Sequence, residues 1–304
     1  MTAPWLEANH LSHRFPLPGG RSLLAVDDVS FRLHQGETLA LVGESGSGKT
    51  TLGRMVVGLT APQSGSLSFA GSAIRAPRRE VQMVFQDNAA ALNPRHGIGA
   101  SVMAPLLWTG GLRRAAAEAQ ARALLDRVGL PAEHFFTRLP HELSGGQRQR
   151  VGIARALAPN PSVLVADEPV SALDVSVRAQ ILLLFRELRD ERGLASLFIT
   201  HDLGVVRSVA QLVLVLYRGR VVEQGPVAAV MDRPRHPYSQ ALRAATPVPD
   251  PDRPRPATPR PPDLGDVPGC AFRARCPQAH AACAVPPPLR AVAAEHDVAC
   301  HLAA

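Results

Sequence analysis

The sequence predicts an α/β protein with a largely parallel sheet. Three short apolar runs, residues 38–42, 163–166 and 196–199, have the character of buried strands, and segments of helical pattern lie between them. The 46% apolar content supports a packed core, which excludes a globally disordered chain. Because aromatic residues make up only 4% of the chain, that core is expected to be aliphatic.

Each predicted element has a local cause. The strands are runs of consecutive apolar residues, as expected where a parallel sheet is covered on both faces. Residues 113–128 follow a helical pattern that stops at Gly129, a residue suited to the left-handed end of a helix. Residues 147–158 are also helical and end before Pro159. From Asp87 to Pro140 no strand-like alternation occurs, so we expect a helical insertion spanning about residues 87–158.

The composition changes sharply once along the chain. Eight of the sixteen residues 247–262 are proline, which predicts an extended spacer rather than a helix or a central strand. The spacer divides a body, residues 1–246, from a tail, residues 247–304, that contains all four cysteines. The sequence therefore predicts one large domain with a small C-terminal extension.

The basic balance of the chain does not by itself indicate a nucleic-acid partner. The net charge is +7, but no run of basic residues is longer than two, so scattered surface arginines explain it. No apolar run reaches the roughly 18 residues that cross a bilayer, and the first residues lack the pattern of a signal peptide. We expect a soluble protein of the cytoplasm.

The only lysine of the chain lies in a glycine-rich motif between a predicted strand and a predicted helix. In such a P-loop, backbone N–H groups and the positive end of the helix dipole converge on phosphate oxygens. The compact ammonium of Lys49 would reach the β- and γ-phosphates, where the fixed fork of an arginine is a poor replacement, and Thr50 would bind Mg²⁺. The predicted nucleotide-binding residues are Gly43, Glu44, Ser45, Gly46, Ser47, Gly48, Lys49, Thr50 and Thr51.

Two further segments carry chemistry. Asp167 and Glu168 follow a buried strand. Asp167 would hold Mg²⁺ through the shell of the ion, and Glu168 would orient or deprotonate the attacking water. A second glycine-rich turn opens a second helix and offers more N–H donors to an anion. Since one nucleotide is already covered by the P-loop, this turn is expected to serve the nucleotide of another subunit. Its residues are Ser144, Gly145, Gly146 and Gln147.

Five motifs, in this order, resemble those of ABC-type ATPases over about residues 5–235. They are the P-loop and residues 143–147, 165–169, 171–174 and 200–202. The resemblance implies a P-loop NTPase cassette with a RecA-like parallel sheet, an N-terminal antiparallel β part, a helical insertion, and hydrolysis of ATP with Mg²⁺. It also implies four further site residues. Gln86 would contact Mg²⁺ and couple the site to the membrane partner, and Asp174 would face the other subunit of a dimer. His201 would sense the γ-phosphate, and Phe15 would stack on adenine.

Further segments resemble the oligopeptide/dipeptide importer branch, which includes nickel and glutathione importers. They are residues 91–95, 174–182 and 236–242, together with the proline spacer and the cysteine tail. Val170 departs from the threonine usual in the family. The resemblance implies an ATPase subunit at the cytoplasmic face of the cell membrane that energises an importer of di- or oligopeptides. Nickel, glutathione or another small solute stays open as the cargo.

The resemblance also implies the partners of such a subunit. They are a second ATPase subunit, identical or paralogous, that closes with this one over two ATP molecules, two transmembrane permease subunits and, indirectly, an extracytoplasmic solute-binding protein. No nucleic acid is expected.

The four cysteines of the tail leave three alternatives open. Disulfides are rare in the cytoplasm, and no Cys-x-x-Cys pair favours zinc, although His280 and His301 could assist a zinc site. Four thiolates suit a [4Fe–4S] cluster, and some relatives of this branch are thought to carry one on matching cysteines. Free thiols are the third alternative. The candidate cluster ligands are Cys270, Cys276, Cys283 and Cys300.

Two other classes of protein compete with the transport ATPase. One is an ABC-type ATPase that acts on ribosomes or DNA, but such proteins usually carry two cassettes or long coiled coils, and this chain has one cassette and no heptad run. The other is an ordinary P-loop kinase or GTPase, which leaves residues 143–147 without a role.

Overall fold

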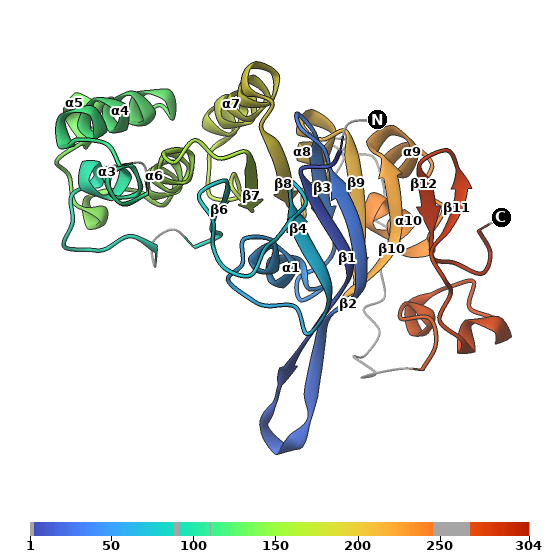
Figure 1. The fold of residues 1–304 in the computed structure, drawn as a ribbon. Helices are drawn as coiled ribbons and strands as arrows, with labels where there is room; N and C mark the ends of the chain where they lie inside the picture. The colour runs from blue at the N-terminus through green and yellow to red at the C-terminus, as the bar shows by residue number, and fades with distance from the viewer. Residues whose placement is uncertain (1–2, 88–90, 110, 246–267, 304) are drawn as a thin grey trace.

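The computed structural model describes residues 3–87, 91–109, 111–245 and 268–303 (Figure 1). Two β-sheets lie in the centre, a group of helices lies on one side, and the C-terminal tail lies on the other. This arrangement confirms the predicted α/β cassette with an antiparallel N-terminal part and a helical insertion. The predicted proline spacer, residues 247–262, lies outside the described residues.

The larger sheet has the strand order β11-β12-β10-β9-β3-β8-β7-β6. Strands β9, β3, β8, β7 and β6 are parallel neighbours, whereas β10, β12 and β11 pair antiparallel. Every residue of β3, β7 and β8 is buried, because helices or the second sheet cover both faces of these strands. The bounds are β3 Thr38–Val42, β6 Val81–Val84, β7 Val163–Asp167, β8 Ala195–Ile199, β9 Leu212–Tyr217, β10 Arg220–Pro226, β11 Arg290–Ala293 and β12 His296–Val298.

The smaller sheet is antiparallel, with the order β2-β1-β4-β5. Its apolar face packs with α1 and the larger sheet into one aliphatic cluster. The aliphatic core predicted from the composition is thus present, and it fixes the N-terminal strands beside the P-loop. The bounds are β1 Leu6–Pro16, β2 Ser22–Leu33, β4 Ser64–Phe69, β5 Ser72–Ala73 and α1 Lys49–Val56.

The helical insertion predicted for about residues 87–158 contains α3, α4, α5 and α6, and the described part of this range contains no strand. Helix α4 ends one residue before Val128, and Gly129 follows with φ +71°, as predicted for a left-handed helix end. Helix α6 packs against α3, α4 and β6, which joins the insertion to the sheet. The bounds are α3 Ile98–Trp108, α4 Arg114–Arg127, α5 Ala132–Phe135 and α6 Gly145–Leu157.

The C-terminal part closes the other end of the molecule. Strand β12 pairs with β10, so this part of the tail extends the main sheet. Buried His296 Nε2 lies 2.8 Å from Glu223 Oε1 and links these two strands. Within the described residues no helix is long and apolar enough to cross a membrane. The remaining bounds are α7 Val175–Arg192, α8 Leu203–Val209, α9 Val227–Asp232 and α10 Pro237–Ala245, with single 3₁₀ turns at Pro18–Gly20, Pro140–Glu142, Arg273–Arg275 and Ala281–Ala284.

Candidate active site

Four parallel strands deliver the predicted site residues to one edge of the sheet. The carboxyl end of β3 leads into the P-loop, that of β7 into Glu168, that of β8 into His201 and that of β6 into Gln86. These strands are consecutive in the sheet, in the order β3-β8-β7-β6. Ligands bind outside the carboxyl ends of parallel strands in open α/β sheets, and the predicted residues converge at this edge.

The P-loop needs glycine where it turns most tightly. Gly43 has φ +155° and Gly48 has φ +102°, and a Cβ added to them would lie 2.2 Å from the Leu216 carbonyl oxygen and 2.0 Å from that of Ala25. No other residue fits so close to neighbouring backbone. Glu44, Ser45 and Gly46 form the exposed tip, Ser47 is buried, and Thr50 and Thr51 open α1.

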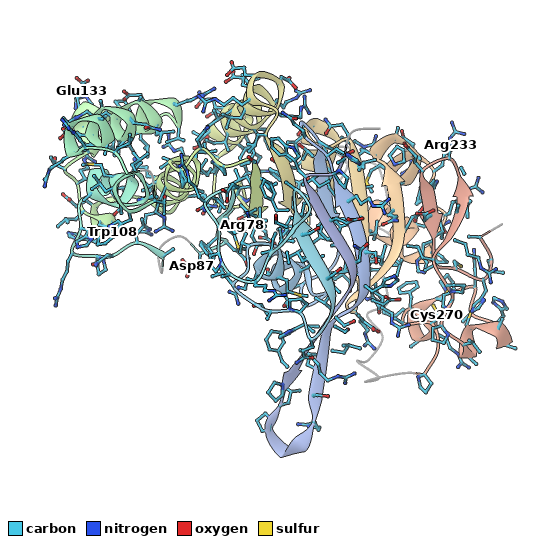
Figure 2. The ribbon with its side chains drawn as sticks, in the orientation of Figure 1. Arg78, Asp87, Trp108, Glu133, Arg233 and Cys270 are labelled. Atoms are coloured by element: carbon cyan, nitrogen blue, oxygen red, sulfur yellow. The ribbon has the colours of Figure 1, made fainter. Side chains whose placement is uncertain are left out.

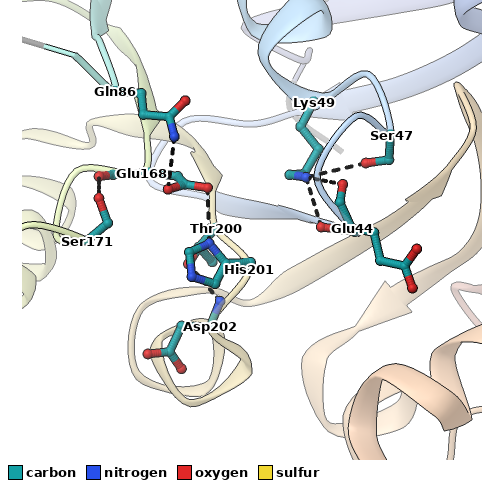
Figure 3. A network of polar contacts seen from close by, with 10 residues as sticks. Glu44, Ser47, Lys49, Gln86, Glu168, Ser171, Thr200, His201 and Asp202 are labelled. Carbon is teal, nitrogen blue, oxygen red and sulfur yellow. Dashed lines mark hydrogen bonds and ion pairs between the residues drawn. The ribbon is translucent and has the colours of Figure 1, made fainter. Parts of the chain in front are cut away.

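Lys49 lies at the mouth of the loop with only 7% of its surface exposed. Its Nζ donates hydrogen bonds to the carbonyl oxygens of Gly43, at 2.8 Å, and Glu44, at 2.7 Å, and lies 3.3 Å from Ser47 Oγ (Figure 3). Burial lowers the pKa of Lys49, and the carboxylates of Glu168, Asp167 and Glu44 oppose that shift. The carbonyl oxygens of the loop therefore accept the hydrogen bonds of the ammonium, and phosphate oxygens could take their place as acceptors.

Asp167 ends β7 and is 1% exposed. Burial raises the pKa of its carboxyl, and a hydrogen bond with the Thr50 side chain acts in the opposite direction. Its Oδ2 is buried without a hydrogen-bond partner among the described residues. An unpartnered carboxylate oxygen beside a hydroxyl provides hard oxygen ligands, so the pair fits Mg²⁺ or the water shell of that ion.

Glu168 lies at the centre of the site. Its φ is +47°, an uncommon conformation for a residue with a side chain and one that occurs at functional positions. His201 Nδ1 lies 3.0 Å from Oε1, and Gln86 Nε2 donates to Oε2 at 3.3 Å. The Ser171 hydroxyl donates to the Glu168 carbonyl oxygen at 3.0 Å (Figure 3). The structure thus brings together three of the predicted catalytic residues, each from a different strand end.

Ser144 and Gln147 lie elsewhere, at the start of α6. Ser144 Oγ accepts from Gln147 N at 3.2 Å, and Gln147 Oε1 accepts from Ser144 N at 2.9 Å, which forms a reciprocal cap. A Cβ added to Gly146 would lie 3.2 Å from the Ala172 carbonyl oxygen, whereas one added to Gly145 would meet nothing within 4 Å. The turn therefore opens α6, and its backbone is open at Gly145 but closely packed at Gly146.

Asp174 and Phe15 hold peripheral positions. Asp174 caps α7 by accepting from Val177 N at 2.9 Å and from the Ser176 hydroxyl at 2.7 Å, and these hydrogen bonds lower the pKa of its carboxyl. Phe15, on β1, is 37% exposed, and its ring meets the edge of His13 at a centroid distance of 4.6 Å. Phe15 thus presents an exposed aromatic surface, and Asp174 has a local structural role.

All four cysteines belong to the tail, and Cys270 lies far from the helical part that carries Trp108 (Figure 2). Burial raises the pKa of the Cys270 thiol, and the three other cysteines add to this rise. All four are free thiols, and Cys283 Sγ lies 3.4 Å from His280 Nδ1. In the described part of the chain, however, no three His, Cys, Asp or Glu side chains are arranged to hold a metal ion. As the side chains stand, the predicted ligands do not fit a cluster.

Two residues that touch the P-loop were missed by the sequence analysis. The Tyr238 hydroxyl accepts from Glu44 N at 2.8 Å, and Arg275 forms two hydrogen bonds with the Glu44 carboxylate. Tyr238 lies in residues 236–242, a segment that the sequence connects only with the importer branch and not with the P-loop. Arg275 is adjacent to Cys276, a predicted cluster ligand, and has no predicted role of its own. These contacts join residues that are 194 and 231 positions apart, and no pattern in the sequence indicates that residues so far apart are close in the fold.

Comparison with known proteins decides the family. A profile described as ABC transporter matches residues 26–171, and one described as the C-terminal region of oligopeptide/dipeptide transporters matches residues 222–283. A protein of Brucella abortus (strain 2308), named as a peptide import ATP-binding protein, is 50% identical over 96% of this chain and 90% of its own length. The chain belongs to the ABC transporter family. It is an ATP-binding cassette that hydrolyses ATP, with Mg²⁺ as the cofactor of the reaction, and it is not a P-loop kinase or GTPase.

Other relatives show how the family varies. A glutathione import ATP-binding protein of Pectobacterium atrosepticum is 50% identical over 82% of this chain, which spans 42% of that longer relative. A dimeric ATP-binding cassette solved in a post-hydrolysis state with ADP and Pi matches with a TM-score of 0.68 and 28% identity, over 73% of this chain and 98% of that one. A cassette of Clostridium perfringens, part of an ABC transporter complex, has a TM-score of 0.65 and 28% identity, over 76% and 92% of the two chains.

Proposed function

We propose that this chain is the ATP-hydrolysing subunit that energises an importer of di- or oligopeptides. The match of residues 222–283 to the C-terminal region of oligopeptide/dipeptide transporters supports a transport role over a role on ribosomes or DNA. The relative that aligns along nearly the whole chain carries a peptide import name. Glutathione import is the alternative favoured by a specific observation, the name of another relative; nickel or another small solute has less support.

The observation that carries the catalytic part is the position of Glu168, held between Gln86 and His201 at the same sheet edge as Lys49. Glu168 orients the attacking water and takes its proton, while His201 senses the γ-phosphate. Lys49 and the loop N–H groups from Gly43 to Thr51 bind the phosphates. Thr50, Gln86 and Asp167 hold Mg²⁺, which neutralises phosphate charge when bound. Phe15 stacks on adenine.

A second cassette completes the site. Ser144, Gly145, Gly146 and Gln147 open a helix that packs on the helical part, and the open backbone at Gly145 leaves room for a phosphate. These residues and Asp174 contact the nucleotide held by the P-loop of the partner cassette, identical or paralogous. The dimeric form of a structural relative supports this arrangement.

The dimer docks on two permease subunits at the cytoplasmic face of the cell membrane, with a solute-binding protein on the other side. The peptide import name of one relative and the transporter complex that includes another support this assembly.

The tail carries a second part of the proposal, a [4Fe–4S] cluster on Cys270, Cys276, Cys283 and Cys300. The presence of all four cysteines of the chain in this tail, as free thiols, supports it. Because no three of them stand in a metal-binding arrangement, side-chain rotation would have to accompany binding. No step of ATP hydrolysis runs through this group.

Co-purification from detergent-solubilised membranes tests the transport role. Tagged full-length chain should bring down two hydrophobic subunits and a second ATPase subunit. The purified complex, placed in liposomes with its binding protein, should hydrolyse ATP faster with a dipeptide or oligopeptide than with glutathione or Ni²⁺. A chain that never fractionates with membranes contradicts the transport role, and stimulation by glutathione alone contradicts the peptide assignment.

A further inference from the structure

Two residues of the C-terminal part of the chain form hydrogen bonds with Glu44 of the P-loop. Arg275 Nη1 donates to Glu44 Oε2 at 2.7 Å and Arg275 Nη2 donates to Glu44 Oε1 at 2.8 Å, so the two side chains form a bidentate ion pair. The buried hydroxyl of Tyr238 accepts from the backbone N–H of Glu44 at 2.8 Å. Figure 3 shows that the Glu44 side chain points away from Glu168 and His201, while its carbonyl oxygen contacts Lys49. One residue therefore connects the tail to the phosphate-binding lysine.

The groups that hold Glu44 are themselves fixed. The Arg275 guanidinium lies 5.8 Å from the ring centroid of Tyr217 and 5.6 Å from that of Phe272. These rings and Tyr238 pack against one another and are each less than 5% exposed. The hydrogen bonds with Glu44 raise the pKa of Arg275, so the guanidinium stays charged. A charged fork supported on two rings positions a carboxylate more strictly than a free surface arginine does.

The ion pair between Arg275 and Glu44 affects ATP binding through charge. Glu44 is exposed at the tip of the loop, and its carboxylate is near enough to Lys49 to act on the pKa of that lysine. An unpaired carboxylate there would repel the phosphates of ATP, which carry several negative charges. The ion pair with Arg275 neutralises it and directs it away from the catalytic carboxylate, Glu168.

We propose that Arg275 is a positioning residue for ATP, which acts through Glu44 and makes the nucleotide affinity of the cassette depend on its C-terminal extension. The inference rests on the proposed nucleotide site at Lys49. It adds to that site a contact from a part of the chain about 230 residues away, next to Cys276. The extension is thereby part of the machinery that binds ATP.

The test measures ATP binding by the full-length chain and, in the assembled complex, KM and kcat for hydrolysis. Arg275→Ala should raise the Kd and KM for ATP about tenfold, the size of effect expected from a charge-assisted pair, and change kcat at saturating ATP less than about twofold. Arg275→Lys, which keeps the charge and loses the fork, should raise the Kd about threefold. Arg273→Ala, on the same 3₁₀ turn and exposed, should bind ATP like the wild type.

A double variant shows whether the effect runs through Glu44. In Glu44→Gln the carboxylate is absent, so adding Arg275→Ala should change the Kd by less than about twofold relative to Glu44→Gln alone. Unchanged Kd in Arg275→Ala overturns the inference, as does a tenfold effect that persists in the Glu44→Gln background. A lower Tm and kcat at unchanged Kd would show a structural role only, which also overturns it.

Two further arms keep the result decisive. If Arg275→Ala does not fold, the folded Arg275→Lys protein decides, and an unchanged Kd there contradicts the role of the fork. Lys49→Ala separates this inference from the proposed site. Loss of binding in Lys49→Ala with normal binding in Arg275→Ala removes the inference alone, whereas equal binding by Lys49→Ala and wild type removes the site and the inference with it.

Discussion

His201 Nδ1 lies 3.0 Å from Glu168 Oε1, and the two residues follow neighbouring parallel strands, β8 and β7. The histidine is 65% exposed in its side chain, whereas Glu168 is only 18% exposed. The carboxylate is therefore shielded by protein on most sides and contacts the solvent-facing imidazole on one. Glu168 also adopts a left-handed backbone conformation, at φ +47°, which is uncommon for a residue with a side chain.

Replacing Glu168 with glutamine should reduce ATP hydrolysis by at least about 100-fold, because the amide has nearly the same size and shape but cannot take a proton. ATP binding should persist, which equilibrium binding of a fluorescent ATP analogue would measure. Glu187→Gln, an exposed change on α7, is the matched control. Turnover at the wild-type rate in Glu168→Gln would contradict its role as the base.

Replacing Lys49 with arginine should abolish hydrolysis although the charge is kept, with a loss of about 100-fold or more. Lys49 is only 7% exposed, and a planar guanidinium is too large to make the same three contacts with Gly43, Glu44 and Ser47. A steady-state ATPase assay measures the loss. Normal turnover would refute the argument, and the reverse exchange at an exposed site, Arg186→Lys, should leave the rate unchanged.

Replacing Asp167 with asparagine should raise the Mg²⁺ concentration needed for half-maximal activity by about tenfold or more. The carboxylate has one buried oxygen without a partner, beside the Thr50 hydroxyl, and asparagine preserves the shape while removing the charge. Titration of activity with Mg²⁺ at fixed ATP measures the shift. Asp190→Asn, exposed on α7, serves as the control, and an unaltered Mg²⁺ requirement would exclude Asp167 from the metal site.

The C-terminal packing should weaken at acidic pH because of His236. Burial lowers the pKa of this histidine to about 4, against about 6.5 in an unfolded chain. The unfolded state thus binds more protons between these values, so the free energy of unfolding decreases as pH falls through this window, by about 2 kcal/mol at pH 5. Denaturant unfolding at pH 8 and pH 5 measures the loss.

A substitution separates the contribution of His236 from the general effect of pH. His236→Gln should reduce the difference in unfolding free energy between pH 8 and pH 5 by about that amount, whereas His141→Gln, on an exposed 3₁₀ turn, should not. If the His236 variant retains the full pH dependence, another group is responsible.

The cluster proposal predicts that protein purified without oxygen is brown and contains iron and sulfide close to four of each per chain. Cys283→Ser, at the buried thiol, should lose the colour and the iron. Colourless, iron-free protein prepared in this way contradicts the proposal. Zinc at about one equivalent, with loss in the His280→Ala variant, would favour the alternative with histidine assistance.

The sequence by itself determined the features whose signals are local. The three predicted strands appear as β3, β7 and β8 within one residue of their predicted bounds, because consecutive aliphatic residues are buried on both faces of a parallel sheet. The helix that stops at Gly129 appears as α4, and the P-loop lies between β3 and α1. The order of the motifs was sufficient to predict the cassette.

Only the tertiary structure decided which of these segments lie together. The contacts of Glu168 with His201 and Gln86 depend on the sheet order β3-β8-β7-β6, which no local pattern specifies. The sequence predicts a C-terminal extension without placing it, and in the structure β12 joins the main sheet and Arg275 reaches Glu44. Hydrophobic patterns specify which face of a strand is buried. Which strand lies beside it depends on packing across the whole chain, and contacts between side chains of neighbouring strands therefore depend on that packing too.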